Sequence, residues 1–177
     1  MPRKIEISAP AAIHSRPGNT VSFELSTIES RKNHKDEAVK YSFGDIDSLD
    51  ATLEKLNLDP KRRRFVLYPN LMWDANSIKR ATIFESPIHW IRHTIDWFKA
   101  HPASDLIIRI HPAEAVRGVS ESVANLVNEH CPSLPSNIKI IEANEEISSF
   151  NVQQITDVGL VYTSTVGMEL ALLGKPV

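Results

Sequence analysis

From Phe65 onward, hydrophobic and polar residues follow a regular alternation of short apolar runs and longer stretches with helical spacing. The apolar runs predict strands near residues 65–69, 105–110, 137–141 and 158–162. Strands that alternate with helices indicate an α/β fold with one parallel sheet, covered by helices on both faces. We expect the strand order 3-2-1-4 with right-handed crossovers.

The helices expected between these strands begin at recognisable signals. Ser86-Pro87 opens the first, because serine caps a helix and proline fits its first turn. Apolar residues at helical spacing predict three more helices, over residues 119–131, 147–155 and 166–173. Gly174-Lys175-Pro176 stops the last helix and leads toward a further strand.

Residues 1–60 are weakly patterned and are expected to form an irregular N-terminal segment, followed by an α/β domain over residues 61–177. Asp47-Ser48 can cap a short helix that ends before Asp59-Pro60. The basic run Lys61–Arg64 is interpreted as a solvated lead-in to the first strand, because little else supports a targeting or nucleic-acid patch.

Composition narrows the class of protein. The 177 residues are 42% hydrophobic and 24% charged, with a net charge of -2, which is ordinary for a globular protein and unlike a general nucleic-acid binder. One cysteine, Cys131, allows no intrachain disulfide and no cysteine cluster for a metal. No apolar run approaches the roughly 20 residues of a membrane span, and no signal peptide is evident. We therefore expect a cytoplasmic protein.

Ligands of open parallel sheets bind beyond the carboxyl ends of the strands. Three of the four loops that follow the predicted strands carry groups suited to phosphate, sugar or nucleobase contacts. The four loops begin with Asn70-Leu71-Met72-Trp73-Asp74, His111-Pro112-Ala113-Glu114, Glu142-Ala143-Asn144 and Thr163-Ser164-Thr165. Their convergence at one edge is stronger evidence for a site than any single loop.

The turn Thr163-Ser164-Thr165 is the candidate phosphate-binding element, because hydroxyl groups here precede a helix. Neither a Gly-x-Gly-x-x-Gly sequence nor a P-loop occurs in the chain. Ser164 or Thr165 could equally be a plain helix cap. Glu169, one helical turn later, could accept hydrogen bonds from ribose hydroxyls or could simply face solvent.

The remaining candidates also have two interpretations. His111 could be a structural histidine, or it could donate a hydrogen bond or a proton to a phosphate. Trp73, in a strand-end loop, is a candidate for stacking on a sugar, whereas Trp90 and Trp97 are interpreted as core or interface aromatics. His89 and His93 have the spacing of a metal pair on a helix, but no third ligand is evident, so no metal site is expected.

Three segments resemble the capsule polysaccharide biosynthesis family: Val66–Ala75, Ile108–Glu114 and Tyr162–Val177. Characterised members of this family include Kdo transferases with a GT-B fold, in which two Rossmann-like domains face a cleft. The order and spacing of the three segments carry the resemblance, which extends over Leu58–Val177.

The resemblance implies a glycosyltransferase donor site for a CMP-activated acidic sugar, with Kdo as the expected sugar and no other cofactor. A His-Pro pair and a Ser/Thr pair that contact the donor phosphate also occur in bacterial sialyltransferases, which use a CMP donor. By position, His111 and Ser164-Thr165 would hold the cytidylate phosphate and Glu169 would contact the ribose or base. Asn70, Trp73 and Asp74 would line the cleft toward the acceptor. The resemblance names no catalytic base.

The implied partners are the nucleotide-sugar donor, a glycan or lipid-linked acceptor, and capsule assembly machinery at the inner membrane, without nucleic acid. Compared with the family, residues 1–60 are at most a remnant of, or linker from, an acceptor-side domain, and further strands are expected after Val177. We therefore expect the chain alone to be poorly soluble or oligomeric and to have little transferase activity.

Two other functions stay open. A non-catalytic factor for capsule polysaccharide assembly or transport could retain the same fold as an interaction module. A sugar-nucleotide epimerase of GT-B fold has a similar turn followed by a glutamate, and it would bind UDP rather than CMP. Affinity for cytidylate would separate the transferase from both.

Overall fold

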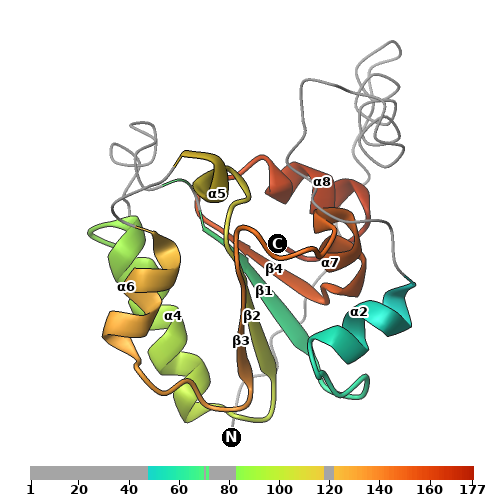
Figure 1. Cartoon of the computed structure of the whole chain (residues 1–177), viewed down its shortest axis with the longest axis horizontal. Helices are drawn as coiled ribbons and strands as arrows, with labels where there is room; N and C mark the ends of the chain where they lie inside the picture. The colour runs from blue at the N-terminus through green and yellow to red at the C-terminus, as the bar shows by residue number, and fades with distance from the viewer. Residues whose placement is uncertain (1–47, 70, 72–82, 118–121) are drawn as a thin grey trace, which may run out of the picture. The chain divides into compact units, whose positions relative to one another are not determined.

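Four parallel strands form the centre of the structure (Figure 1), a computed structural model that describes residues 48–69, 71, 83–117 and 122–177. These residues all belong to the larger of two units in the chain, Asp36–Val177. The strands are β1 (Arg64–Tyr68), β2 (Asp105–Arg109), β3 (Ile138–Ile141) and β4 (Val158–Val161). Their order is β3-β2-β1-β4 and every neighbouring pair is parallel, which confirms the predicted strand order and the parallel sheet.

The register of the four strands aligns their carboxyl ends. Leu67 of β1 lies opposite Ile108 of β2 and Leu160 of β4, and Ile108 in turn lies opposite Ile140 of β3. Because each strand rises by about 3.3 Å per residue, equal offsets from these positions reach equal heights on the sheet. The loops that follow the four strands therefore leave the sheet at the same edge and at the same level.

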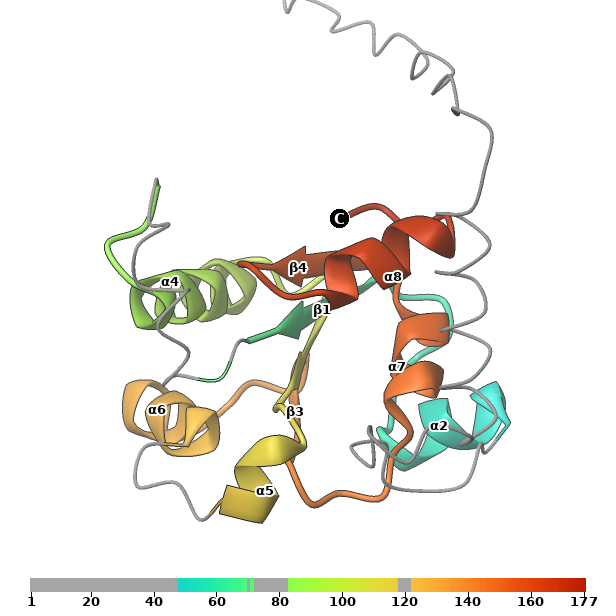
Figure 2. The same cartoon turned by 90° about the horizontal axis from the view of Figure 1, so that it is seen from above.

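Helices cover both faces of the sheet, as the alternation of elements predicts (Figure 2). One face carries α4 (Pro87–Ala100) and α6 (Val123–His130). The other carries α2 (Leu49–Lys55), α7 (Ser149–Ile155) and α8 (Val166–Leu172). The remaining described helix, α5 (Ala113–Arg117), follows β2 at the carboxyl edge.

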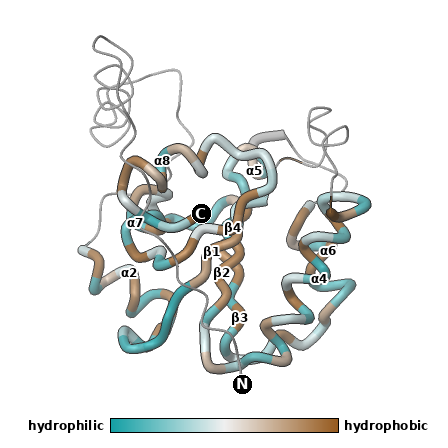
Figure 3. Tube along the Cα trace, turned by 180° about the vertical axis from the view of Figure 1, so that it is seen from behind, coloured by the Kyte–Doolittle hydropathy of each residue, from teal (hydrophilic) through white to brown (hydrophobic). Residues whose placement is uncertain are grey.

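The two faces have separate hydrophobic cores because successive side chains of a strand point to opposite sides. On β2, Leu106 and Ile108 pack with α4 and α6, whereas Ile107 packs with α7 and α8. All three are fully buried. In the hydropathy trace the strands are predominantly hydrophobic, while the connection from α2 to β1 is hydrophilic (Figure 3).

The predicted helix start at Ser86-Pro87 is confirmed: Ser86 Oγ accepts from the His89 backbone N–H and Pro87 is the first helical residue. The second predicted helix begins later than expected, at Val123, where Ser122 Oγ caps it by accepting from the Asn125 N–H. Helix α5 was not predicted, because five residues are too few to show a helical period.

The basic run before β1 is more than a solvated lead-in. Arg64 belongs to β1 and donates from Nε and a terminal guanidinium nitrogen to both carboxylate oxygens of Asp157, the residue before β4. Arg62 Nε lies 3.0 Å from a carboxylate oxygen of Asp105, the first residue of β2. These arginines join the amino ends of three neighbouring strands, because a guanidinium can bind a carboxylate with several donors at once.

Helix α8 ends as the sequence predicts. Gly174 has a φ of 69°, a left-handed conformation that glycine adopts without the steric cost of a side chain. The chain then returns along β4, where the Gly159 N–H donates to the Pro176 carbonyl at 2.8 Å. The predicted division of the chain near residue 60, by contrast, stays a prediction.

Candidate functional site

The loops that carry His111 and Thr163 leave the carboxyl edge of the sheet at the same height. Ile108 and Leu160 both lie opposite Leu67, and His111 and Thr163 each follow by three residues. Strand β1 separates the two loops, so at the usual strand spacing they begin roughly 10 Å apart. The fold therefore brings the His-Pro segment and the hydroxyl-rich turn to one edge.

His111 lies two residues after the end of β2 and is half-buried. The Ala113 backbone N–H donates to its Nδ1 at 3.1 Å, so the proton of the neutral ring lies on Nε2. Burial and the nearby charge of Arg109 both lower the pKa of His111, which keeps the imidazole neutral at pH 7. His111 is therefore suited to donate a hydrogen bond from Nε2, rather than to supply a positive charge.

The hydroxyl-rich turn after β4 uses its two hydroxyls differently. Ser164 Oγ accepts from the Val166 N–H at 3.3 Å, a local bond within the turn. Thr165 occupies the cap position of α8, yet its side chain makes no capping hydrogen bond and is exposed. Ser164 therefore acts in part as the local cap that the sequence left open as an alternative. Its O–H can still donate a hydrogen bond.

Glu169 does not simply face solvent, which was one of the two interpretations of this residue. Its side chain is half-buried, and Oε2 accepts from Gln153 Nε2 of α7 at 2.6 Å. Near Glu169, the buried Tyr68 hydroxyl donates to Thr156 Oγ1, because Thr156 already donates its own proton to the Val152 carbonyl. Burial, and secondarily the charge of Glu169, raises the pKa of Tyr68.

The other three candidates, Asn70, Trp73 and Asp74, lie outside the described residues. Their assignment to the acceptor side of the cleft stays a prediction.

Three charged residues lie at the carboxyl edge; sequence reasoning placed Glu114 and Glu142 in strand-end loops without a role and did not single out Arg109. Arg109 is 3% exposed and donates to the carbonyls of Glu142 and Ile147. Glu114 is 6% exposed and accepts from the Val123 N–H, and burial raises its pKa. Burial and the charge of Glu145 raise the pKa of Glu142. The available signal was the charge of Arg109, which directly follows the apolar residues Leu106–Ile108 of β2.

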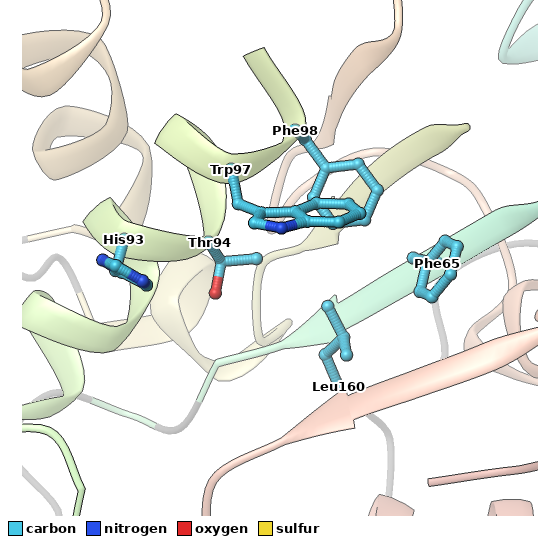
Figure 4. A pocket seen from close by; sticks show the side chains of 6 residues that line it. All are labelled: Phe65, His93, Thr94, Trp97, Phe98 and Leu160. Carbon is cyan, nitrogen blue, oxygen red and sulfur yellow. The ribbon is translucent and has the colours of Figure 1, made fainter. Parts of the chain in front are cut away.

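A cleft of about 240 Å³ lies on the α4 face of the sheet and is mostly apolar. Helix α4 contributes His93, Thr94, Trp97 and Phe98, and the sheet contributes Phe65 and Leu160 (Figure 4). Phe65 is near the amino end of β1, and the cleft is on the face opposite α7 and α8. This cleft is therefore distinct from the carboxyl-edge loops.

The aromatic and histidine residues of α4 have structural contacts. Trp90 is buried in the core, as expected, whereas Trp97 is 46% exposed and stacks on His101. His89 and His93 both contact the Phe84 ring.

Among the described residues, no three His, Cys, Asp or Glu side chains are grouped so that they could hold a metal ion. No helix in the described ranges combines the length and apolar character needed to cross a membrane.

Comparison with known proteins identifies one family and a related fold. The family described as "Capsule polysaccharide biosynthesis protein" matches residues 27–177. The structure of Thermosulfurimonas dismutans KpsC, beta Kdo 2,4 transferase, is similar with a TM-score of 0.56 and 16% sequence identity, over 89% of this chain and 44% of that one. At this identity the likeness shows a shared fold, and the chain spans less than half the length of that structure.

A second structure, Thermosulfurimonas dismutans KpsC, beta Kdo 2,7 transferase, matches over 86% of this chain and 45% of that one, with 15% identity and a TM-score of 0.45. That score is too low to support an argument. No curated protein sequence gives a significant match.

Proposed function

The chain belongs to the capsule polysaccharide biosynthesis family, and from this premise we propose that it is the donor-binding part of a glycosyltransferase. The transferred sugar would be Kdo, carried by CMP, and the acceptor a glycan or a lipid-linked glycan. The observation that carries the proposal is the common edge of the sheet at which the His111 segment and the Thr163–Thr165 turn emerge. It is supported by the shared fold with Thermosulfurimonas dismutans KpsC, a beta Kdo 2,4 transferase.

In the proposed reaction, the bond between the anomeric carbon and the cytidylate oxygen breaks, the acceptor hydroxyl oxygen forms the new glycosidic bond, and the hydroxyl proton is released to water. CMP departs with the electron pair, so negative charge develops on its phosphate. Nε2–H of His111 and the hydroxyls of Ser164 and Thr165 would donate hydrogen bonds to this phosphate, and donors placed where charge develops lower the barrier. Glu169, held by Gln153, would accept from a ribose hydroxyl.

Calorimetric titration of the chain with nucleotides tests the proposal. We expect CMP to bind more tightly than UMP or UDP. Replacing both Ser164 and Thr165 by alanine removes two hydroxyl contacts to a charged group, each worth roughly 1.5–3 kcal/mol, so CMP affinity should fall by at least tenfold.

Ser133→Ala is the matched control, because it removes an exposed hydroxyl from the loop that leads into the amino end of β3. It should leave CMP affinity unchanged. Tighter binding of UDP than CMP would instead favour the epimerase. Equal CMP affinity of the double variant and the wild type would reject this turn as the phosphate site.

A further inference from the structure

Arg109, the last residue of β2, is a buried cation that holds a neighbouring segment of the carboxyl edge. One terminal guanidinium nitrogen donates to the Glu142 carbonyl at 2.8 Å and the other to the Ile147 carbonyl at 3.2 Å. These carbonyls are at the two ends of the connection from β3 to α7. The guanidinium therefore fixes the course of residues 142–147.

The charge of Arg109 has no carboxylate partner at ion-pair distance in the described structure. Its Nε is buried without a hydrogen bond. Glu145 is near enough to affect the guanidinium, but its carboxylate accepts from the Glu142 N–H. Burial lowers the pKa of Arg109 only to about 10, so the side chain remains charged at pH 7. A buried charge that is held by carbonyls and has no carboxylate at ion-pair distance is costly.

The position of Arg109 indicates what could compensate this charge. Ile107 packs against α7 and α8, and Arg109 follows two residues later, on the same face of the strand. The charge acts on both His111 and Tyr68. Because Coulomb interactions weaken slowly with distance in a protein interior, the charge also favours an anion bound beyond His111.

We propose that Arg109 is a positioning residue whose buried charge is balanced by the phosphate of a bound nucleotide, while its guanidinium holds the segment 142–147 beside that phosphate. The inference rests on the donor site proposed above and identifies the cation that this site requires. Among the described groups of the proposed site, His111 is neutral at pH 7 and the turn hydroxyls carry no charge, so Arg109 supplies the positive potential there. A purely structural clamp would need the hydrogen bonds of the guanidinium but not its charge.

Two substitutions in the full chain test whether the charge of Arg109 or the hydrogen bonds of its guanidinium are needed for anion binding. Arg109→Lys keeps the charge, but its single ammonium group cannot donate to the Glu142 and Ile147 carbonyls with the geometry of a guanidinium. Arg109→Gln removes the charge. Arg92→Gln, at an exposed position on α4, is the control for losing one positive charge from the protein. Each protein is titrated with CMP and with cytidine, and its melting temperature is measured with and without pyrophosphate.

We expect Arg109→Gln to bind CMP at least tenfold more weakly, with cytidine affinity within twofold of the wild type and no stabilisation by pyrophosphate. Arg109→Lys should keep CMP affinity within about fivefold and still be stabilised by pyrophosphate, and Arg92→Gln should behave as wild type. Equal loss of CMP and cytidine affinity in both variants would overturn the proposal in favour of a structural clamp. Unchanged CMP affinity in Arg109→Gln would also overturn it.

Two outcomes distinguish this inference from the proposed function. If pyrophosphate stabilises the wild type in an Arg109-dependent way but CMP does not bind, the CMP donor is wrong and the anion-balancing role stands. If neither CMP nor pyrophosphate binds the wild type, both are overturned. If Arg109→Gln does not fold, Arg109→Lys is the deciding variant. If Arg109 acts only through its hydrogen bonds, pyrophosphate should no longer raise the melting temperature of Arg109→Lys. If its charge matters, pyrophosphate should still raise it.

Discussion

Replacing Gln153 by leucine tests the contact that holds Glu169 at the carboxyl edge. Gln153 is 7% exposed and its Nε2 donates to Glu169 Oε2 at 2.6 Å. Leucine has a similar volume but no donor. The substitution therefore removes one hydrogen bond to a half-buried carboxylate, with little change in packing between α7 and α8.

The expected cost follows from the environment of the bond. A hydrogen bond to a charged group contributes roughly 1.5–3 kcal/mol when it is buried. Partial exposure of Glu169 lets water screen its charge, so we expect the free energy of unfolding to fall by about 1–2 kcal/mol. In a protein of this size that corresponds to a decrease in melting temperature of roughly 3–6 °C.

Urea unfolding followed by tryptophan fluorescence measures the change. Gln154→Leu is the matched control, because this neighbouring glutamine is only half-buried and its side chain makes no hydrogen bond with the residues that the structure describes. A double-mutant cycle with Glu169→Leu isolates the pairwise term, which should be at least about 0.5 kcal/mol. A cost of Gln153→Leu no greater than that of the control, or a coupling energy of zero, would refute the reasoning.

Two further substitutions test the core and the edge. Ile107→Ala should lower the free energy of unfolding by about 2–5 kcal/mol, because Ile107 is fully buried in the α7–α8 core; a loss in urea unfolding below 1 kcal/mol would contradict this burial. Burial raises the pKa of Glu114 above the usual 4.5, so its ionisation costs stability as the pH rises past that value. Glu114→Gln, whose amide oxygen can still accept from the Val123 N–H, should therefore raise the melting temperature at pH 8 but much less at pH 5; an equal gain at both would show that charge is not the cause.

Local sequence was sufficient for the elements and their order. The apolar runs of the four strands, the cap at Ser86 and the stop at Gly174 are each encoded within a few residues. The alternation of strands and helices then limits the topology, because crossovers are right-handed and short. The same reasoning led to the prediction that His111 and the Thr163–Thr165 turn share one edge, because carboxyl ends of parallel strands lie together.

The charged and polar contacts at that edge could not be predicted in the same way. Arg109 reaches a carbonyl 33 residues away, Arg64 a carboxylate 93 residues away, and Gln153 a glutamate 16 residues away on another helix. Nothing near Arg109 in the sequence distinguishes a buried cation from one that extends to solvent. A side chain's burial and its partner depend on how helices pack on the sheet, and hydrogen bonds form between whichever donors and acceptors that packing excludes from water. The sequence alone determined which strands exist and which edge carries the loops, whereas tertiary packing decided which charges lie beneath them.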